Sequence, residues 1–210
     1  IDASLAIIVV HLEVPFAVLL AAVFFRERPG LQRLLGMTVS FAGIILIAGL
    51  PSVEGQLFAI VLTGSGALIW SVGQIMYKRI SDRITGLAAV AWIAVMAGPQ
   101  MLVGSILFES GQLTALINAT WVGWGSVVYL GLVMTVLGYG IWYTVLARNP
   151  VSHVMPVLLL LPVFTIAASI LLLGERPSPG VLSGGAIVLC GVALIVFTRS
   201  PQGPKTSNAP

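Results

Sequence analysis

Charged side chains are scarce in this sequence. Asp, Glu, Lys and Arg together make up 8% of its 210 residues, whereas apolar residues make up 58% and the mean hydropathy is +1.07. So few polar side chains cannot cover the surface of a water-soluble globule of this length. The composition therefore excludes a soluble protein and predicts an integral membrane protein.

Cysteine and histidine are nearly absent as well. Cys190 is the single cysteine and lies in an apolar run, so no intramolecular disulfide can form and we interpret the residue as a packing residue. His11, Glu13 and His153 could together suggest a metal site, but their spacing does not supply several ligands from one helix face. We therefore predict neither a metal site nor a cofactor.

Long apolar runs are what the sequence does contain. A helix needs ~20 residues to cross a hydrocarbon core of ~30 Å, and seven runs approach or exceed that length. They are residues 3–25, 31–50, 57–77, 85–108, 121–146, 151–173 and 179–198. Short breaks rich in Gly, Pro and charge separate them. We predict an all-α fold of seven transmembrane helices, with successive helices antiparallel, and a disordered tail over residues 199–210.

Basic residues concentrate at alternate breaks, which indicates the orientation of the chain. Nine fall on one side of the predicted bilayer, and only Arg176 falls on the other. The nine are Arg26, Arg28, Arg33, Lys78, Arg79, Arg83, Arg148, Arg199 and Lys205. Cytoplasmic loops retain positive charge, so we predict a cytoplasmic C-terminus and an outer position for Ile1. The net charge of +3 thus reflects orientation in a lipid bilayer, and we predict no nucleic acid partner.

An internal repeat links the first and last quarters of the chain. A shift of 148 residues makes 8 of the 21 positions from Glu27 to Ile47 identical to their later counterparts, among them the Glu-Arg-Pro triplets that begin at Glu27 and Glu175. The copies begin in the first and sixth predicted spans, five crossings apart, so they must enter the membrane in opposite directions. Inverted-topology repeats of this kind are typical of secondary transporters.

The predicted spans do not divide evenly between the two copies. The later copy ends a five-helix unit, whereas only two helices belong to the earlier one. We therefore predict a ten-helix fold of two inverted five-helix halves. Residues 1–50 are then the last two helices of the N-terminal half, residues 51–198 are the complete C-terminal half, and residues 199–210 are a cytoplasmic tail. On this hypothesis about three further helices precede Ile1 in the natural protein.

Three motifs resemble those of a known family. They are Gly138-Tyr139-Gly140-Ile141-Trp142, the run from Pro156 to Pro162 that leads to Gly174-Glu175-Arg176, and Trp70 with Gln74 before Lys78-Arg79. These motifs resemble the EamA family of the drug/metabolite transporter superfamily, in particular bacterial exporters of O-acetylserine, cysteine and aromatic amino acids. The resemblance covers residues 3–197. It implies ten spans, cytoplasmic termini, an inner-membrane location and efflux of a small metabolite, but it does not select the substrate.

Polar residues inside the first span are candidates for binding. Glu13 lies near the middle of the span, where an ionised carboxylate costs ~2.5–3.5 kcal/mol on insertion scales. It could handle a substrate amine or a coupling proton, or be a neutral residue bonded to a neighbouring helix. His11 lies about 200° away around a helix, so both cannot face one cavity squarely. We select both as candidate cavity residues and interpret His153, near a span end, as interfacial.

Three aromatic and amide residues complete the predicted cavity. Trp70 and Gln74 lie one helical turn apart in the third span, and we select them with Tyr139 of the fifth span as substrate-binding candidates. The alternative is an aromatic belt at the headgroups, which suits Tyr77 better, with Gln74 as an interhelical contact. The fifth span repeats the spacing of the third with Thr135, Tyr139 and Trp142.

Proline and glycine residues inside the spans indicate where helices bend and where they pack closely. Pro15, Pro156 and Pro162 each remove a backbone donor, so we predict kinks or hinges there. The pattern Gly36-x3-Ser40-x2-Gly43 and its counterpart Gly184-x6-Gly191 are typical of close helix contacts. We interpret Glu27 and Glu175, at membrane boundaries, as caps or gates.

These observations favour a secondary transporter that exports small amphipathic metabolites, amino acids or their derivatives, by alternating access, with proton coupling left open. A nucleotide-sugar carrier is the alternative within the superfamily, but basic residues for its phosphates are missing at depth. An intramembrane enzyme would need more than His11 and Glu13. A seven-helix receptor fits the span count and does not explain the repeat.

Overall fold

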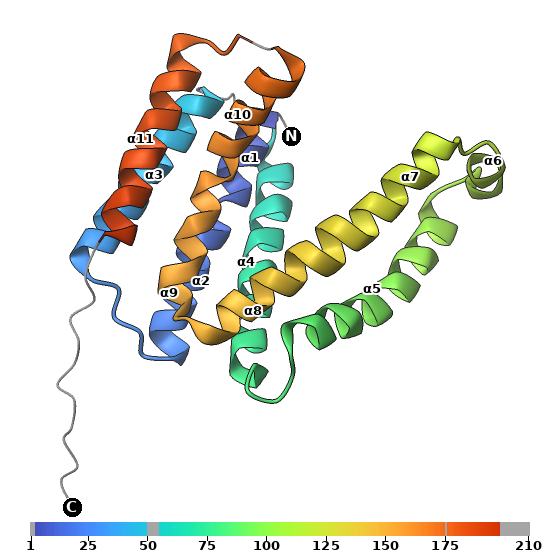
Figure 1. Ribbon diagram of the computed structural model, residues 1–210, viewed down its shortest axis with the longest axis horizontal. Coiled ribbons are helices and arrows are strands. Elements are labelled where there is room, and N and C mark those ends of the chain that lie inside the picture. Colours follow the sequence, from blue (N-terminus) through green and yellow to red (C-terminus); the bar gives the residue numbers. More distant parts are fainter. Residues whose placement is uncertain (1–2, 50–54, 175, 198–210) are drawn as a thin grey trace, which may run out of the picture. The chain divides into compact units, whose positions relative to one another are not determined.

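The structure is a computed structural model that describes residues 3–49, 55–174 and 176–197 (Figure 1). Within these residues there are helices and no strands. Seven helices are long and apolar enough to cross a membrane: Leu5–Phe24, Leu31–Ala48, Leu57–Ile80, Gly86–Phe108, Trp121–Arg148, Val151–Leu173 and Pro179–Val196. They match the seven predicted runs to within a few residues, so the prediction of an all-α membrane protein with seven spans is confirmed. Glu175 and the tail lie outside the described residues.

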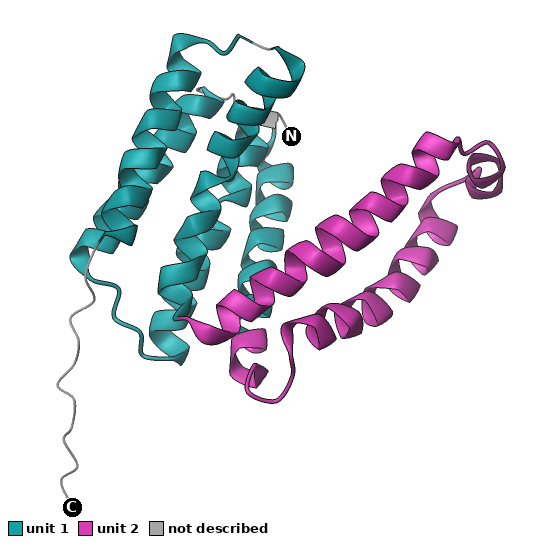
Figure 2. Cartoon of the chain, viewed as in Figure 1, with its two compact units in different colours: residues 1–75, 150–210 teal, residues 76–149 magenta. Residues whose placement is uncertain are grey.

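The chain divides into two compact units (Figure 2). Unit 1 comprises residues 1–75 and 150–210, and unit 2 comprises residues 76–149. The division falls within α4 (Leu57–Ile80), whose last turn belongs to unit 2. Unit 1 therefore contains both copies of the internal repeat.

The repeat-related helices α3 (Leu31–Ala48) and α11 (Pro179–Val196) pack against each other along their length (Figure 1). A Cβ atom added to Gly36 would lie 2.6 Å from the carbonyl oxygen of Gly191, and one added to Gly43 would lie 2.7 Å from that of Gly184. Between these contacts the Ser40 hydroxyl donates to the carbonyl of Val188 at 3.3 Å. The predicted close contact at the glycines is confirmed. Because Gly36 meets Gly191 while Gly43 meets Gly184, the two copies run antiparallel.

The first span is broken in its middle. Helix α1 (Ala3–Val10) ends before His11, and α2 (Glu13–Phe24) begins after Leu12. Pro15 has no N–H with which to reach the carbonyl of His11, and the N–H of Val14 donates to that carbonyl instead at 3.2 Å. The proline thus coincides with a local change from α-helical to tighter hydrogen bonding.

The sixth span is broken too. It consists of α9 (Val151–Val154), the 3₁₀ helix η2 (Met155–Leu160) and α10 (Leu161–Leu173). Pro156 and Pro162 lie near the two ends of η2. The repeat shift carries residues 11–12 onto residues 159–160, where η2 gives way to α10. Both copies of the repeat are therefore interrupted at the same place, and α2 packs against α9 and η2.

Unit 2 is a hairpin of long helices. Its elements are α5 (Gly86–Phe108), α6 (Gln112–Ile117), α7 (Trp121–Tyr129), the π-helix η1 (Leu130–Tyr139) and α8 (Gly140–Arg148). Helix α5 approaches α8 closely, since a Cβ atom at Gly86 would lie 2.9 Å from the carbonyl oxygen of Gly140. The ammonium group of Lys78 donates to the carbonyls of Leu146, Ala147 and Asn149 at 2.7–2.9 Å and so caps the end of α8.

The π-helix corrects one prediction about the fifth span. The spacing of Thr135, Tyr139 and Trp142 predicts one stripe of a regular α-helix, but residues 130–139 have π-helical hydrogen bonding. The Thr135 hydroxyl donates to the carbonyl of Leu130, five residues earlier, at 3.0 Å. A wider turn changes the direction in which successive side chains point. The regular stripe is therefore interrupted.

Candidate functional site

Glu13 lies where the first span resumes after its break. It occupies the first turn of α2, where the exposed N–H groups of the helix end favour negative charge. Its backbone carbonyl accepts a hydrogen bond from the Ser71 hydroxyl of α4 at 2.8 Å. The side chain is half-buried, and no hydrogen bond or ion pair to its carboxyl group occurs within the described residues. The carboxyl group is thus held at the break and left available to a proton or a ligand.

Helix α4 places Gln74 beside this break. Ala67, Ser71 and Gln74 form its buried face at 6%, 0% and 1% exposure, whereas Trp70 is 38% exposed. Ser71 also donates to the carbonyl of Ala67 at 2.8 Å, so its one hydrogen is shared between two acceptors. Gln74 therefore belongs to the helix face that contacts the Glu13 backbone, and Trp70 lies towards its margin.

His11 faces a different environment from Glu13. Its Nδ1 atom lies 2.7 Å from the carbonyl oxygen of Ile7, and its side chain is only 7% exposed. Its Nε2 atom is buried and has no hydrogen-bond partner in the described part of the chain. The Nδ1 contact to a carbonyl requires a proton on that nitrogen, which leaves Nε2 of the neutral ring as an acceptor.

His11 helps to line a cavity of about 680 Å³ within unit 1, which we call the His11 cavity. It is lined by Ile7, His11, Ile47, Leu161, Pro162, Thr165, Ile166, Ser169, Arg176, Pro177 and Val181. The lining comes from α1, α3, α10, α11 and the segment that links the last two. Glu13 is absent from this lining.

Sequence reasoning missed the other polar residues of the His11 cavity. Thr165, Ser169 and Arg176 were not among the predicted site residues, because each looks ordinary for a helix or a membrane boundary. The repeat contained a usable signal: the shift of 148 aligns Thr165 with Ala17 and Ser169 with Ala21. Hydroxyl groups in one copy thus replace alanines in the other.

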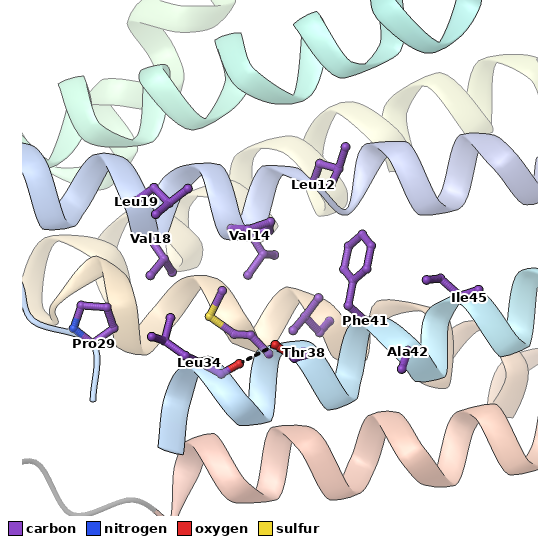
Figure 3. Close-up of a pocket in the computed structure, with 13 residues that line it drawn as sticks. Leu12, Val14, Val18, Leu19, Pro29, Leu34, Thr38, Phe41, Ala42 and Ile45 are labelled. Carbon is purple, nitrogen blue, oxygen red and sulfur yellow. Dashed lines mark hydrogen bonds between the residues drawn. The ribbon is translucent and has the colours of Figure 1, made fainter. Parts of the chain in front are cut away.

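A second cavity in unit 1 is almost entirely apolar. It has a volume of about 500 Å³ and lies between α2 and α3, whose side chains Val14, Val18 and Phe41 point towards it (Figure 3). Its one hydroxyl, that of Thr38, donates to the carbonyl of Leu34 in its own helix at 2.9 Å. This cavity offers apolar surface and no means of orienting a polar ligand.

Glu27 and Arg176 lie at opposite ends of the antiparallel pair α3 and α11. The two carboxylate oxygens of Glu27 accept hydrogen bonds from the backbone N–H groups of Val151 and Ser152 at 3.0 and 2.8 Å. The predicted role as a cap is confirmed, and the capped helix is α9. Arg33 and His153 both interact electrostatically with Glu27.

The aromatic residues of unit 2 form a cluster. The Tyr77 and Tyr143 rings lie 4.5 Å apart between centroids, and Tyr139 stacks on Tyr143 at 6.2 Å. Tyr77 is 5% exposed, so its predicted place in an aromatic belt at the headgroups is wrong. Tyr139 is 39% exposed and presents the accessible side of this cluster.

No three His, Cys, Asp or Glu side chains gather as a metal site requires in the described ranges. His11, Glu13 and His153 fall in three different settings. The site residues thus separate into a half-buried carboxyl group at a helix break, a cavity lined by hydroxyls with one guanidinium, and a tyrosine cluster in unit 2.

The fold and these sites define a class of protein: a helical membrane protein with antiparallel repeat-related helices, irregular spans and internal polar groups. A model of the EamA-like transporter family matches residues 1–49 and 57–197. The chain therefore belongs to the EamA-like transporter family. It is a transporter and not an enzyme.

Several relatives carry names that describe export. A "Probable amino-acid metabolite efflux pump" of Salmonella typhimurium is 32% identical over 203 residues, which covers 93% of this chain and 68% of that protein. Its namesake in Escherichia coli is 30% identical with the same coverage. A "Probable terminal-alkyne amino-acid exporter" of Streptantibioticus cattleyicolor is 32% identical over 196 residues, which covers 93% of this chain and 64% of that protein.

The fold resembles that of a solved structure. A protein crystal structure superimposes with a TM-score of 0.81, covering 94% of this chain and 69% of the other, at 20% sequence identity. At that identity the likeness concerns the fold alone. About a third of each of these longer proteins has no counterpart in this chain.

Proposed function

We propose that this protein exports amino acids or their derivatives across the inner membrane by alternating access. The observation that carries the proposal is a pair of irregular spans: the first and sixth spans, which the repeat relates, both depart from regular α-helix at the same repeat position, and α2 packs against α9 and η2 within unit 1. Discontinuous helices in inverted repeats are a general mark of transport sites, because their breaks leave backbone groups available to substrate. The names of the relatives support the amino-acid class of cargo.

The complete transporter has, in this proposal, ten helices in two inverted halves and a cytoplasmic C-terminus. The antiparallel contact of α3 with α11 supports the inversion, and the excess of basic residues at alternate breaks supports the orientation. Cysteine-labelling from each side of right-side-out vesicles tests the orientation. Labelling of a cysteine at Ser178 from the outside and at Arg83 from the inside is the expected result.

Transport by the full-length protein in proteoliposomes tests the function. Counterflow of a panel of radiolabelled amino acids should exceed that of empty liposomes, whereas nucleotide sugars should give no signal. The opposite pattern would reject the amino-acid proposal and leave the family assignment intact.

Glu13 is the residue proposed to couple export to protons. Its half-buried carboxyl group lies at the helix break without a partner among the described residues. Glu13→Gln should abolish the response of transport to an imposed pH gradient while counterflow at equal pH persists. Glu109→Gln, which changes a carboxyl group bonded to Ser105 at an exposed helix end, is the matched control. An unchanged pH response of Glu13→Gln would refute the coupling role.

A further inference from the structure

The lining of the His11 cavity combines one cationic hydrogen-bond donor, Arg176, with several hydrogen-bond acceptors. Arg176 is exposed, lines the cavity, and takes no partner within the described residues. It directly precedes Pro177, and α10 ends two residues before it at Gly174, which has the left-handed conformation at φ 67°.

The hydroxyl groups of the cavity can only accept hydrogen bonds from a ligand. The Thr165 hydroxyl donates to the carbonyl of Leu161 at 3.0 Å, and the Ser169 hydroxyl donates to that of Ile166 at 3.1 Å. Each hydroxyl has one hydrogen, so the oxygen lone pairs remain for a donor on the ligand. Nε2 of His11, buried without a partner in the described ranges, is a further acceptor of the neutral ring.

The polar groups are ordered along the cavity. Thr165 and Ser169 lie one turn apart on α10, and Arg176 follows the end of that helix, while His11 lies at the break of the first span. A ligand that spans them would meet the guanidinium at one end and acceptors further in. The rest of the lining is aliphatic, with Ile7, Ile47, Ile166 and Val181 among its members.

We propose that the His11 cavity binds the zwitterion of an apolar α-amino acid, with its carboxylate on Arg176 and its ammonium group towards Thr165, Ser169 and His11. Guanidinium pairs with carboxylate through charge-assisted hydrogen bonds, and an ammonium group brings three donors to oxygen and nitrogen acceptors. The aliphatic walls receive the side chain. The volume of about 680 Å³ lies in the range of small-molecule sites. This inference rests on the proposed export of amino acids and names the recognition chemistry.

The repeat offers an internal control for this proposal. The shift of 148 aligns Arg28 with Arg176, and Arg28 is also exposed. Its end of unit 1 has Ala17 and Ala21 in place of the two hydroxyl residues, both at 0% exposure. Arg28 therefore has the same charge and the same repeat position, but it does not line a cavity with such hydroxyl groups: the cavity that the neighbouring Pro29 helps to line is almost entirely apolar.

The test combines changes in the protein with deletions in the ligand. Binding to the purified full-length protein is measured for L-leucine, for its methyl ester, which lacks the carboxylate, and for 4-methylpentanoate, which lacks the ammonium group. Arg176→Gln should lower the affinity for leucine and for 4-methylpentanoate by roughly tenfold or more. The affinity for the ester should not change. Arg28→Gln should change none of the three.

The acceptors are tested in the same way. The double variant Thr165→Val, Ser169→Ala should lower the affinity for leucine and for the ester, but not the affinity for 4-methylpentanoate. Equal effects of Arg176→Gln and Arg28→Gln, or an ester affinity that falls as much as that of leucine in Arg176→Gln, would overturn the proposal. So would absence of leucine binding to the unmodified protein.

Transport measured in parallel separates the two proposals. If leucine is transported with an unchanged KM by Arg176→Gln, export stands and this binding mode is rejected. If leucine binds with the predicted pattern but is not transported, the binding mode stands and the export proposal fails for this amino acid. Thermal unfolding of each variant in detergent controls for loss of structure.

Discussion

The two ends of unit 1 are built from the same repeat and packed differently. At the Glu27 end, Val14, Ala17, Val18 and Ala21 are at most 1% exposed, and the Glu27 carboxylate is bonded to the start of α9. At the Arg176 end, the repeat shift brings Thr165 and Ser169 to the positions of the two alanines, and there they line a cavity of about 680 Å³. The Glu27 end has a cavity too, of about 500 Å³ and lined by Val14, Val18 and Pro29 among others, but that cavity is almost entirely apolar. The two ends thus differ in the polarity of their cavities.

At the Glu27 end a carboxylate also accepts hydrogen bonds from a helix N-terminus, which is a favourable electrostatic contact. The four predictions below test the comparison between the ends, beginning with the feature that the ends share.

The glycine contacts between α3 and α11 should have the largest effect on stability. A Cβ at Gly43 would lie 2.7 Å from the Gly184 carbonyl oxygen, so Gly43→Ala forces the helices apart. We expect destabilisation of roughly 2–3 kcal/mol from overpacking. Gly66→Ala in α4, where nothing lies within 4 Å, is the control. Thermal unfolding of the full-length protein measures both, and equal midpoints would contradict the close contact.

Exchange of repeat-related residues tests the difference in packing directly. Ala17→Thr adds volume at a site with 0% exposure and should destabilise the protein by roughly 1–2 kcal/mol. Thr165→Ala, the reverse exchange in the lining of the His11 cavity, should change stability by less than about 0.5 kcal/mol. Denaturation midpoints in detergent give both values. A larger loss from Thr165→Ala than from Ala17→Thr would reverse the comparison.

Glu27→Gln should loosen the Glu27 end. The amide keeps one acceptor oxygen, so one of the two hydrogen bonds to the N-terminus of α9 is lost and the other loses its negative charge, at a cost of about 1 kcal/mol for a half-buried group. A cysteine placed at Ala21 should then react faster with a water-soluble thiol reagent. Arg28→Gln, an adjacent exposed change, should leave that rate unaltered. An unaltered rate in Glu27→Gln would show that this contact does not limit access to Ala21.

The smallest effect is expected in the apolar cavity of Figure 3. Thr38→Val removes a hydroxyl that bonds only within its own helix, so stability should change by less than about 0.5 kcal/mol. Leucine binding should also be unaffected, in contrast to the loss expected for the variant of Thr165 and Ser169. Weaker leucine binding by Thr38→Val would indicate that leucine binds in this apolar cavity instead of the His11 cavity.

The features that local chemistry controls could be read from the sequence. Seven apolar runs of sufficient length become helices because the bilayer leaves no other way to satisfy the backbone. The glycines at positions 36, 43, 184 and 191 mark a close helix contact because only a residue without a side chain allows it, and Glu27 behaves as a cap.

Tertiary structure decided what depends on partners distant in the sequence. That Ala17 is buried while its counterpart Thr165 lines a cavity follows from how four helices meet, and neither residue type reveals it. The π-helix of the fifth span and the burial of Tyr77 against Tyr143 likewise depend on packing rather than periodicity. The sequence by itself determined the membrane class, the spans and the repeat, because each follows from hydrophobicity and spacing. Only the packed helices decided which end of the repeat has a polar cavity and which side chains share a cavity, because packing depends on the fit of several surfaces at once.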